Sequence, residues 1–498
     1  MNVRSETATA AAREDAPVLV WFRNDLRVGD HPALAAALDS GRPVLPLYIL
    51  EEQAPGDCAL GAASLWWLHH SLDALAGRLA DLGAPLHLRR GRAEDIVPDL
   101  AERLDAAAVF WNRRYEPWAI ATDRDIKATL RDRGVAAESY NGTLLHEPWE
   151  VKTKQGGWYG VFTPFWKAEC ALGDPPAPID PPRGIPAASI AGLPPSDDLA
   201  DWALLPTRPD WAGGLRAAWT PGEAGARDRL SAFLEDGVPD YPETRNIPGI
   251  EGTSRLSPHL HFGELSPRQI WHWALERVRE SGSGKLERGV WAFLREIGWR
   301  DFNHNLLFHT PEMTHKNYQS KFDAFPWRED EAALRAWQQG MTGYPLVDAG
   351  MRELWETGYM HNRIRMLVAS FLVKDLLIPW QRGEAWFRDT LVDADLANNV
   401  ANWQWTAGCG ADAAPYFRIF NPVTQGEKFD PDGAYVRRWV PELADLPNKA
   451  IHAPWTADAQ TLARAKVELG RTYPHPIVDH KRARQLALDA YQEVKGAA

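Results

Sequence analysis

The chain has 498 residues, of which 45% are hydrophobic and 24% charged, the composition of a soluble globular protein. At this length we expect two or three domains, because a single hydrophobic core rarely grows so large. The formal net charge is −12, from 55 basic and 67 acidic residues, which disfavours polyanion binding by the whole surface but leaves room for a local basic groove.

The cysteines and the N-terminal residues indicate the cellular compartment of the protein. The three cysteines, Cys58, Cys170 and Cys409, form no CxxC pair, which excludes a four-thiolate iron–sulfur cluster and offers no disulfide framework. Residues 1–16 lack the apolar core of a signal peptide and are predicted to be a disordered tail. No apolar run approaches the roughly 18 residues of a membrane-spanning helix. The predicted localisation is therefore the cytoplasm, with no membrane partner.

Short apolar runs alternate with helical segments over the first part of the chain. The runs lie at residues 17–22, 43–50, 85–91, 107–112 and 136–142. A helical segment between the first two ends at Gly41, and leucines at three- and four-residue steps from Leu65 to Leu82 predict another. A further helix is expected at 122–134. This alternation predicts a parallel sheet with helices on both faces, a Rossmann-like α/β domain over residues 17–145.

The composition and periodicity of the sequence change twice after this domain. Residues 171–219 are rich in proline and non-periodic, which predicts a linker that crosses a surface and holds no core. With the segment before it, the predicted interdomain linker covers 146–219. Amphipathic helical patterns follow, so we expect an all-α domain at 220–490. They lie at residues 227–237, 266–280, 286–307, 331–340 and 351–358.

One stretch of the helical half, residues 393–405, concentrates unusual side chains. It contains two carboxylates, two amides and two tryptophans: Asp393, Asp395, Asn398, Asn399, Trp403 and Trp405. A packed core rarely takes several Asp and Asn side chains, and a surface loop rarely takes Trp. Aromatic planes among hydrogen-bonding groups suit a large, flat, polar-edged ligand, such as a flavin or a nucleobase.

A nearby glycine-rich motif has a different interpretation, which we reject. GCGADA at 408–413 fits the loose GxGxxA dinucleotide pattern. It follows no predicted strand, opens no βαβ unit and lies in the helical half, so it does not predict a dinucleotide site.

Five motifs together are highly specific. They are WFRNDLRVGDHPAL (21–34), EGTSRLSPHLHFGELSPRQ (251–269), TGYPLVDAGMREL (342–354), GYMHNRIRM (358–366) and WQWTAGCGADAAPYFRIFNPVTQGEKFD (403–430). In these motifs the chain resembles the photolyase/cryptochrome family, most closely its bacterial members that repair cyclobutane pyrimidine dimers. The resemblance covers nearly the whole chain after the tail. It implies an antenna-binding α/β domain followed by an all-α FAD-binding domain, and a light-driven lyase acting on damaged DNA.

The resemblance implies one catalytic FAD, active in its reduced form, and predicts no metal site. The segment that matches the phosphate-binding part of the family comprises Tyr241, Thr253, Ser254, Arg255, Leu256 and Ser257. Hydroxyls, backbone N–H groups and a cation at an expected helix start favour anions, although an ordinary N-cap is the alternative. Arg365, Asp393 and Asp395 match the surroundings of the ribose and isoalloxazine ring, and we expect Arg365 to pair with Asp393.

Asn399 matches the family position that faces flavin N5. A neutral amide stays hydrogen-bonded across flavin redox states without imposing a proton or a charge. Plant cryptochromes carry Asp at this position, which supports a neutral radical, so Asn is the repair-type residue. The alternative is a buried structural amide with satisfied hydrogen bonds.

The resemblance places Glu296, Trp299, Asn362, Met366 and Trp405 around the damaged base pair. Trp299 and Trp405 would stack against the two fused pyrimidines. Glu296 is expected to be buried and protonated, or to share a proton, and to hydrogen-bond a pyrimidine carbonyl.

An ordinary ion pair of Glu296 with Arg300, four residues later, is the alternative for this side chain. Enzymes of the family that repair (6-4) photoproducts carry histidines at the positions of Asn362 and Met366. Cyclobutane dimer repair, which needs no net proton transfer, is therefore favoured.

Electron supply and DNA contacts are also implied by the resemblance. Trp403, Trp380 and Trp327 match the family's electron relay to the surface, with core packing as the alternative for each. Arg245, Arg300, Arg363 and Arg418 match cationic positions around the flavin cavity that contact DNA phosphates. The expected partner is ultraviolet-damaged DNA, double- or single-stranded, bound by a monomer.

A second, antenna chromophore is expected in the α/β domain, near residues 111–117 and 141–148, where strands end. Methenyltetrahydrofolate is favoured, although the chain lacks the Asn-Glu pair that grips it in some bacterial relatives. A folate held differently, 8-hydroxy-deazaflavin, FMN or an empty site remain alternatives. The rival functions are a cryptochrome-type blue-light photoreceptor and, with less support, a (6-4) photolyase. Asn399, the substrate set and the lack of a long C-terminal signalling tail count against the photoreceptor.

Overall fold

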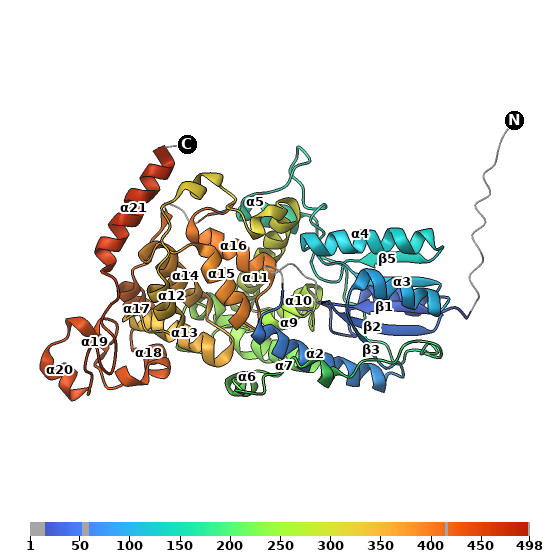
Figure 1. Ribbon diagram of the computed structural model, residues 1–498, viewed down its shortest axis with the longest axis horizontal. Coiled ribbons are helices and arrows are strands. Elements are labelled where there is room, and N and C mark those ends of the chain that lie inside the picture. Colours follow the sequence, from blue (N-terminus) through green and yellow to red (C-terminus); the bar gives the residue numbers. More distant parts are fainter. Residues whose placement is uncertain (1–14, 52–58, 414–416, 497–498) are drawn as a thin grey trace.

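The computed structural model describes residues 15–51, 59–413 and 417–496. The predicted tail, apart from Asp15 and Ala16, and Cys58 lie outside the described residues. An α/β part and a larger helical part lie side by side (Figure 1). The predicted fold class is thereby confirmed.

The α/β part is built on a five-stranded sheet with the order β3-β2-β1-β4-β5, in which every neighbouring pair is parallel. The strands are β1 Val18–Phe22, β2 Val44–Leu50, β3 His87–Arg90, β4 Ala108–Asn112 and β5 Ala136–Tyr140. All five coincide with the predicted runs. Strand order reverses beside β1, so the carboxyl ends of β1 and β4 flank the crevice where open parallel sheets bind ligands.

Helices cover both faces of the sheet because the central strands are apolar on both sides. Alternate residues of β1, such as Val20 and Phe22, pack with α1 Pro32–Asp39 and α2 Ala62–Asp81. On the other face, Trp21 packs with α3 Ala93–Arg103 and α4 Pro117–Asp132. Helix α3 was not predicted from the sequence; it has acidic residues in its first turn and Pro98 in its interior.

The predicted linker is structured, which corrects the expectation that it holds no core. It contains α5 Phe162–Ala171 and α6 Gly213–Ala218. Within its proline-rich part, Trp202, Leu215 and Trp219 are buried in the core between the sheet and α2. Isolated large apolar residues in a non-periodic segment give no periodic signal, yet each one buries enough surface to dock the chain.

The helical part follows the predicted pattern with many short additions. Its helices are α7 Glu223–Ala232, α8 Tyr241–Thr244, α9 Ser257–His261, α10 Pro267–Ser281, α11 Gly284–His309, α12 Glu331–Gln338, α13 Pro345–Thr357, α14 Asn362–Ser370, α15 Trp380–Thr390, α16 Leu396–Ala407, α17 Pro422–Phe429, α18 Ala434–Trp439, α19 Asn448–Ile451, α20 Ala459–Arg464 and α21 His480–Gly496. A π-helical turn, Phe371–Asp375, continues α14.

Two central helices carry most of the predicted site residues. Helix α11 packs against α5, α10 and α16, and α16 packs in turn against α14 and α15. Gly408, with φ of +92°, ends α16 at the start of the rejected GCGADA motif, so this motif is a helix terminus. Among the described helices, none is long and apolar enough to cross a membrane.

Candidate functional site

A cavity of about 460 Å³ lies within the helical part and brings most of the predicted site residues together. Its walls come from residues 241–257, α11, α14 and α16. The predicted residues that line it are Tyr241, Arg245, Thr253, Ser254, Arg255, Leu256, Ser257, Glu296, Trp299, Arg300, Asn362, Arg365, Met366, Asp393, Asp395, Asn399, Trp403 and Trp405. Residues as far apart in sequence as Tyr241 and Trp405 thus form one site of ligand-binding size.

The expected pair of Arg365 and Asp393 is confirmed. The two Nη atoms of Arg365 lie 3.1 and 2.8 Å from the two carboxylate oxygens of Asp393. Ser257 donates its hydroxyl to Asp393 Oδ2 at 2.5 Å. Ser257 therefore does not act as the N-cap considered in the sequence analysis, and α9 has no side-chain cap. Asp393 is held as a charged acceptor on the cavity wall.

Asp395 begins α16 and links it to α11. Its carboxylate accepts from the backbone N–H of Asn398 at 2.8 Å, as an N-cap, and lies 3.3 Å from His304 Nε2. Burial raises the pKa of Asp395, but the charge of His304 and its hydrogen bond outweigh burial and hold the pKa well below its usual range. Asp395 is therefore an ionised carboxylate beside the cavity.

Asn399 is buried one turn into α16 and is oriented by α15. Its Nδ2 donates to the backbone oxygen of Glu384 at 3.2 Å and to Glu384 Oε1 at 2.9 Å. Because the amide nitrogen is turned towards α15, its oxygen is the group left for a ligand in the cavity.

The burial and the partner of Glu296 differ from those expected. Its side chain is 29% exposed and forms an ion pair with Arg245, with Oε1 2.6 Å from Nη1, so the expected burial is wrong. The alternative pairing with Arg300 is wrong as well. Arg300 is buried and donates to the backbone oxygen of Thr143 at 2.6 Å. It thus ties α11 to the α/β part.

The two cavity tryptophans are partly exposed, one on each central helix. The ring of Trp299 on α11 stacks on Phe162 of α5, with centroids 3.6 Å apart and planes at 11°. The N–H of Phe162 donates to Asp412 Oδ2 at 2.9 Å, which fixes the start of α5 behind this stack. One face of Trp299 is therefore occupied by Phe162, and Trp405 of α16 lines the same cavity.

Three of the predicted DNA-contacting arginines lie near one another. Arg245 lines the cavity, and Arg363 begins α14 next to Asn362 and donates to Asn246 Oδ1 at 2.6 Å. Burial lowers the pKa of Arg363, and the charges of Arg245 and Arg418 lower it further. Arg418 is exposed. Arg245, Arg363 and Arg418, called the arginine cluster below, carry local positive charge that Glu296 partly compensates through its ion pair with Arg245.

The three predicted relay tryptophans lie on segments that contact one another. Trp403 lines the cavity, and its ring lies so close to Gly383 that a Cβ there would come within 2.1 Å of it. Trp380 begins α15 one turn before Gly383. Trp327 precedes Arg328, whose N–H donates to the backbone oxygen of Leu377 at 2.8 Å. These contacts place the segments that carry the tryptophans beside one another, and electron transfer between the tryptophans stays a prediction.

Three residues of the site were not predicted from sequence: His304, Glu384 and His261. His304, Arg300 and Glu296 share one face of α11 at four-residue steps, a signal that could have identified His304. Glu384 carries no comparable signal, because its contact with Asn399 depends on how α15 packs on α16. His261 is buried and lines both this cavity and the second cavity described next, and neither ring nitrogen has a hydrogen-bond partner among the described residues.

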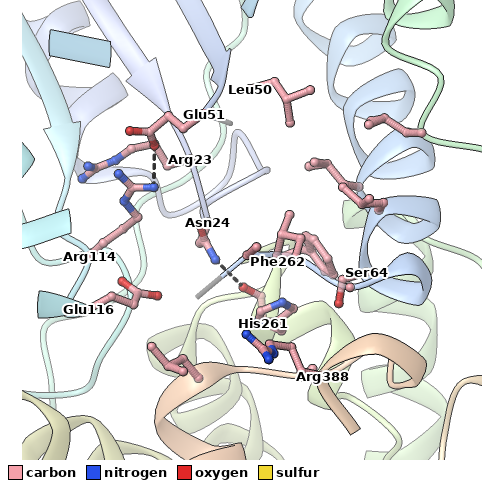
Figure 2. A pocket seen from close by; sticks show the side chains of 18 of the residues that line it. Arg23, Asn24, Leu50, Glu51, Ser64, Arg114, Glu116, His261, Phe262 and Arg388 are labelled. Carbon is pink, nitrogen blue, oxygen red and sulfur yellow. Dashed lines mark hydrogen bonds and ion pairs between the residues drawn. The ribbon is translucent and has the colours of Figure 1, made fainter. Parts of the chain in front are cut away.

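A second cavity, of about 330 Å³, lies between the carboxyl edge of the sheet and helices α2 and α15. Figure 2 shows the Glu51–Arg114 ion pair near the strands, and His261 and Arg388 on the helical side. Trp118 and Trp202 also line it, and Trp118 Nε1 is buried without a partner among the described residues. Of the two segments predicted here, 111–117 contributes Arg114 and Glu116. From 141–148, Thr143 lines a smaller adjoining cavity.

Comparisons with known proteins cover almost the whole chain. Residues 18–183 match the DNA photolyase domain family, and residues 293–493 match the FAD binding domain of DNA photolyase. A deoxyribodipyrimidine photo-lyase of Agrobacterium fabrum is 54% identical over 96% of this chain and 98% of its own length. Cryptochrome-1 of Arabidopsis thaliana is 40% identical over 94% of this chain and 69% of its own length. The crystal structure of a class III photolyase from Agrobacterium tumefaciens is 53% identical and superposes with a TM-score of 0.92, covering 98% of this chain and 100% of that one.

Proposed function

The chain belongs to the DNA photolyase and cryptochrome family, and from this premise we propose that it is a light-driven lyase that repairs cyclobutane pyrimidine dimers in DNA. The observation that carries the proposal is one cavity that joins flavin-type hydrogen-bonding groups, two partly exposed tryptophans and an adjacent arginine cluster. The relatives named as photo-lyases span nearly the whole chain, which supports an enzyme of this class.

The residues of the cavity fit FAD. Asp393, fixed by Arg365 and Ser257, offers an acceptor for ribose hydroxyls or ring N–H groups, while the hydroxyls and N–H groups at 253–257 would hold the phosphates. The oxygen of Asn399 would accept the N–H that a reduced flavin presents at N5. Bound, reduced FAD supplies the electron that light drives into the dimer and that returns once the ring has opened.

The substrate half of the cavity fits two joined pyrimidines. Trp299, stiffened by its stack on Phe162, and Trp405 would lie against the fused rings. Glu296, an ion-paired carboxylate held by Arg245, would accept a hydrogen bond from a pyrimidine ring N–H. Asn362 and Met366 offer no proton donor comparable to a histidine pair, which favours the cyclobutane dimer over the (6-4) photoproduct.

We assign DNA binding to the arginine cluster, which would contact phosphates that flank the extruded dimer. Arg300 is left out, because its guanidinium is buried against Thr143. The protein would act as a monomer on double- or single-stranded DNA in the cytoplasm. Domain boundaries near residues 145 and 220 are kept as proposals, with the intervening segment docked on both parts.

We assign the antenna chromophore to the second cavity. Its indole rings, its buried indole N–H on Trp118 and its arginines suit a flat, polar-edged and anionic molecule. Methenyltetrahydrofolate is favoured over 8-hydroxy-deazaflavin and FMN.

The rival is a cryptochrome-type photoreceptor, in keeping with the likeness to cryptochrome-1. One assay separates the functions. The chemically reduced protein is illuminated with DNA that carries either a cyclobutane dimer or a (6-4) photoproduct, and restored pyrimidines are quantified. Light-dependent repair of the dimer alone supports the proposal. Repair of neither lesion by a flavin-loaded protein favours the photoreceptor.

A further inference from the structure

Lys374 is a fully buried lysine that does not line the flavin and substrate cavity. It lies on the π-helical turn Phe371–Asp375 that follows α14, and none of its side chain is exposed. Removing an ammonium group from water is costly unless its neighbours compensate. The contacts of Lys374 therefore indicate the role of this lysine in the structure.

Those contacts converge on one segment of backbone. Lys374 Nζ donates to the backbone oxygen of Arg418 at 2.6 Å and lies 4.5 Å from the centre of the Phe417 ring. Burial lowers the pKa of Lys374 to about 7, against the opposing charge of Asp375. Asp375 itself is held by His480 of α21, with Oδ1 2.5 Å from Nδ1.

The backbone on both sides of Arg418 is fixed as well. Phe417 has a φ of +46°, which is unusual for a bulky residue and persists only where surroundings enforce it. Its ring lies parallel to Tyr491 of α21, with centroids 4.4 Å apart and planes at 3°. The N–H of Phe420 donates to Ser370 Oγ at 3.3 Å. The Arg418 side chain, by contrast, is exposed.

We propose that Lys374 is a positioning residue for DNA binding, which fixes the backbone of Arg418 so that its guanidinium joins Arg245 and Arg363 in the arginine cluster. Burial is the main cause of the lowered pKa of Arg363, and the charges of Arg245 and Arg418 lower it further, so the like charges of Arg363 and Arg418 oppose their approach in the free protein. With the segment fixed in advance, backbone phosphates meet a preformed site. The inference rests on the proposed function, because it takes DNA as the ligand.

A double-mutant cycle tests the proposal. The variants Lys374→Met, Arg418→Ala and their combination are titrated with a duplex that carries one cyclobutane dimer. Arg418→Ala should weaken binding about eightfold at 0.1 M salt, because one neutralised phosphate contributes a salt slope of about −0.9. Lys374→Met should weaken binding in the same direction, and the double variant should bind no more weakly than Arg418→Ala alone. The flavin absorption spectrum should not change in any of the three variants.

Lys449→Met, the same change at an exposed position on α19, is the control and should bind as the unmodified protein does. Losses that multiply in the double variant, or a changed repair rate at saturation with unchanged affinity, would overturn the proposal. If Lys374→Met does not fold, Ser370→Ala decides, with a smaller loss of affinity expected that also vanishes in the Arg418→Ala background. If Arg418→Ala binds normally while dimers are repaired, positioning fails and the proposed function stands. If the unmodified protein repairs no dimer, the proposed function itself fails.

Discussion

At the scale of single residues, the contact between Asn399 and Glu384 explains why an amide suits position 399. Its Nδ2 lies 2.9 Å from Glu384 Oε1, a contact that an amide makes as a donor. A carboxyl group at this position would face Glu384 as a second acid, and two carboxyls this close share a proton. The neighbourhood on α15 thus favours an amide at position 399.

Asn399→Asp should therefore introduce a protonated carboxyl next to the flavin, because Glu384 would raise the pKa of the new group. We expect the photoreduced flavin to shift from its anionic towards its neutral radical form, as measured by absorption spectroscopy during illumination. Asn402→Asp, on the same helix and the same cavity wall, controls for added charge alone. An unchanged anionic spectrum in Asn399→Asp would place the residue away from N5.

Glu169 and Asp301 form a second pair of acids, buried between α5 and α11. No N–H group donates to the oxygens of Glu169 within the described ranges, and its carboxyl neighbours that of Asp301, whose Oδ2 accepts from the N–H of Leu145 at 2.7 Å. Burial raises the pKa of Asp301 to about 6 and that of Glu169 well above its usual range, which the charge of Asp301 reinforces. The folded protein therefore holds a proton here that the unfolded chain releases.

The sign of the pH dependence follows from this proton. The free energy of unfolding should fall as pH rises from about 4.5 through 6 and beyond, because the unfolded state binds fewer protons in that range. Glu169→Gln gives Asp301 a permanent donor, so it should flatten this slope and stabilise the protein by roughly 1–3 kcal/mol at pH 8. Urea unfolding at pH 5.5 and 8 measures the free energy of unfolding at each pH. The control is Glu280→Gln, the same change at an exposed position. Equal slopes in the variant and the unmodified protein would contradict the shared proton.

At the scale of elements, the packing of α15 on α16 positions Trp380 and Trp403, two of the three tryptophans of the predicted relay. Gly383 lets the Trp403 ring approach the α15 backbone, since any larger residue would collide with the ring. Trp380, at the first residue of α15, is buried and donates its indole N–H to Asn317 Oδ1 at 2.8 Å. The start of α15 is thereby fixed relative to the cavity.

Trp380→Phe should block photoreduction of the oxidised flavin and spare repair by chemically reduced enzyme, because only the relay needs an oxidisable indole. Flavin reduction under blue light and repair of dimer-containing DNA are measured on the same preparation. Trp439→Phe, on α18 and partly buried against the same core, is the matched control. Loss of both activities in Trp380→Phe would mean that the residue is structural.

Elements also show where sequence reasoning succeeds. The central strands β1, β2 and β4 were predictable because both faces of the sheet are covered, so each is a nearly continuous apolar run. The edge strands β3 and β5 are more polar, and their place in the strand–helix alternation predicted them. Helix α3 was missed because Pro98 and its charged residues obscure the helical pattern. The burial of Trp202 and Trp219 in the proline-rich segment was missed because docking of single side chains leaves no period.

Within the site, residue type and the family resemblance identified more than half of the cavity-lining residues, and of their partners only the pair of Arg365 and Asp393. Glu296 was expected to be buried, but its exposure is set by Arg245 from another segment. Phe162 could not be linked to Trp299 from sequence, because their stack depends on how α5 docks on α11. Long-range contacts of this kind belong to tertiary packing and carry no local signal.

At the scale of the whole molecule, the two cavities share a wall. His261 and Ala394 line both of them, and Glu384 contacts Asn399 of the first cavity while lining the second. An antenna bound at the sheet edge would therefore lie next to the flavin, separated by one layer of side chains. Such closeness suits transfer of excitation energy from one chromophore to the other.

This arrangement makes the antenna assignment testable. Protein purified under air protection should show a near-ultraviolet or blue band besides that of FAD, whose position distinguishes methenyltetrahydrofolate from 8-hydroxy-deazaflavin or FMN. Trp118→Ala removes an indole plane and its buried N–H from the second cavity, so it should abolish that band and leave the FAD content unchanged. Trp149→Phe, at an exposed position outside both cavities, should keep both bands. An antenna band that survives Trp118→Ala would place the chromophore elsewhere, whereas joint loss of antenna and FAD would indicate that the shared wall had collapsed.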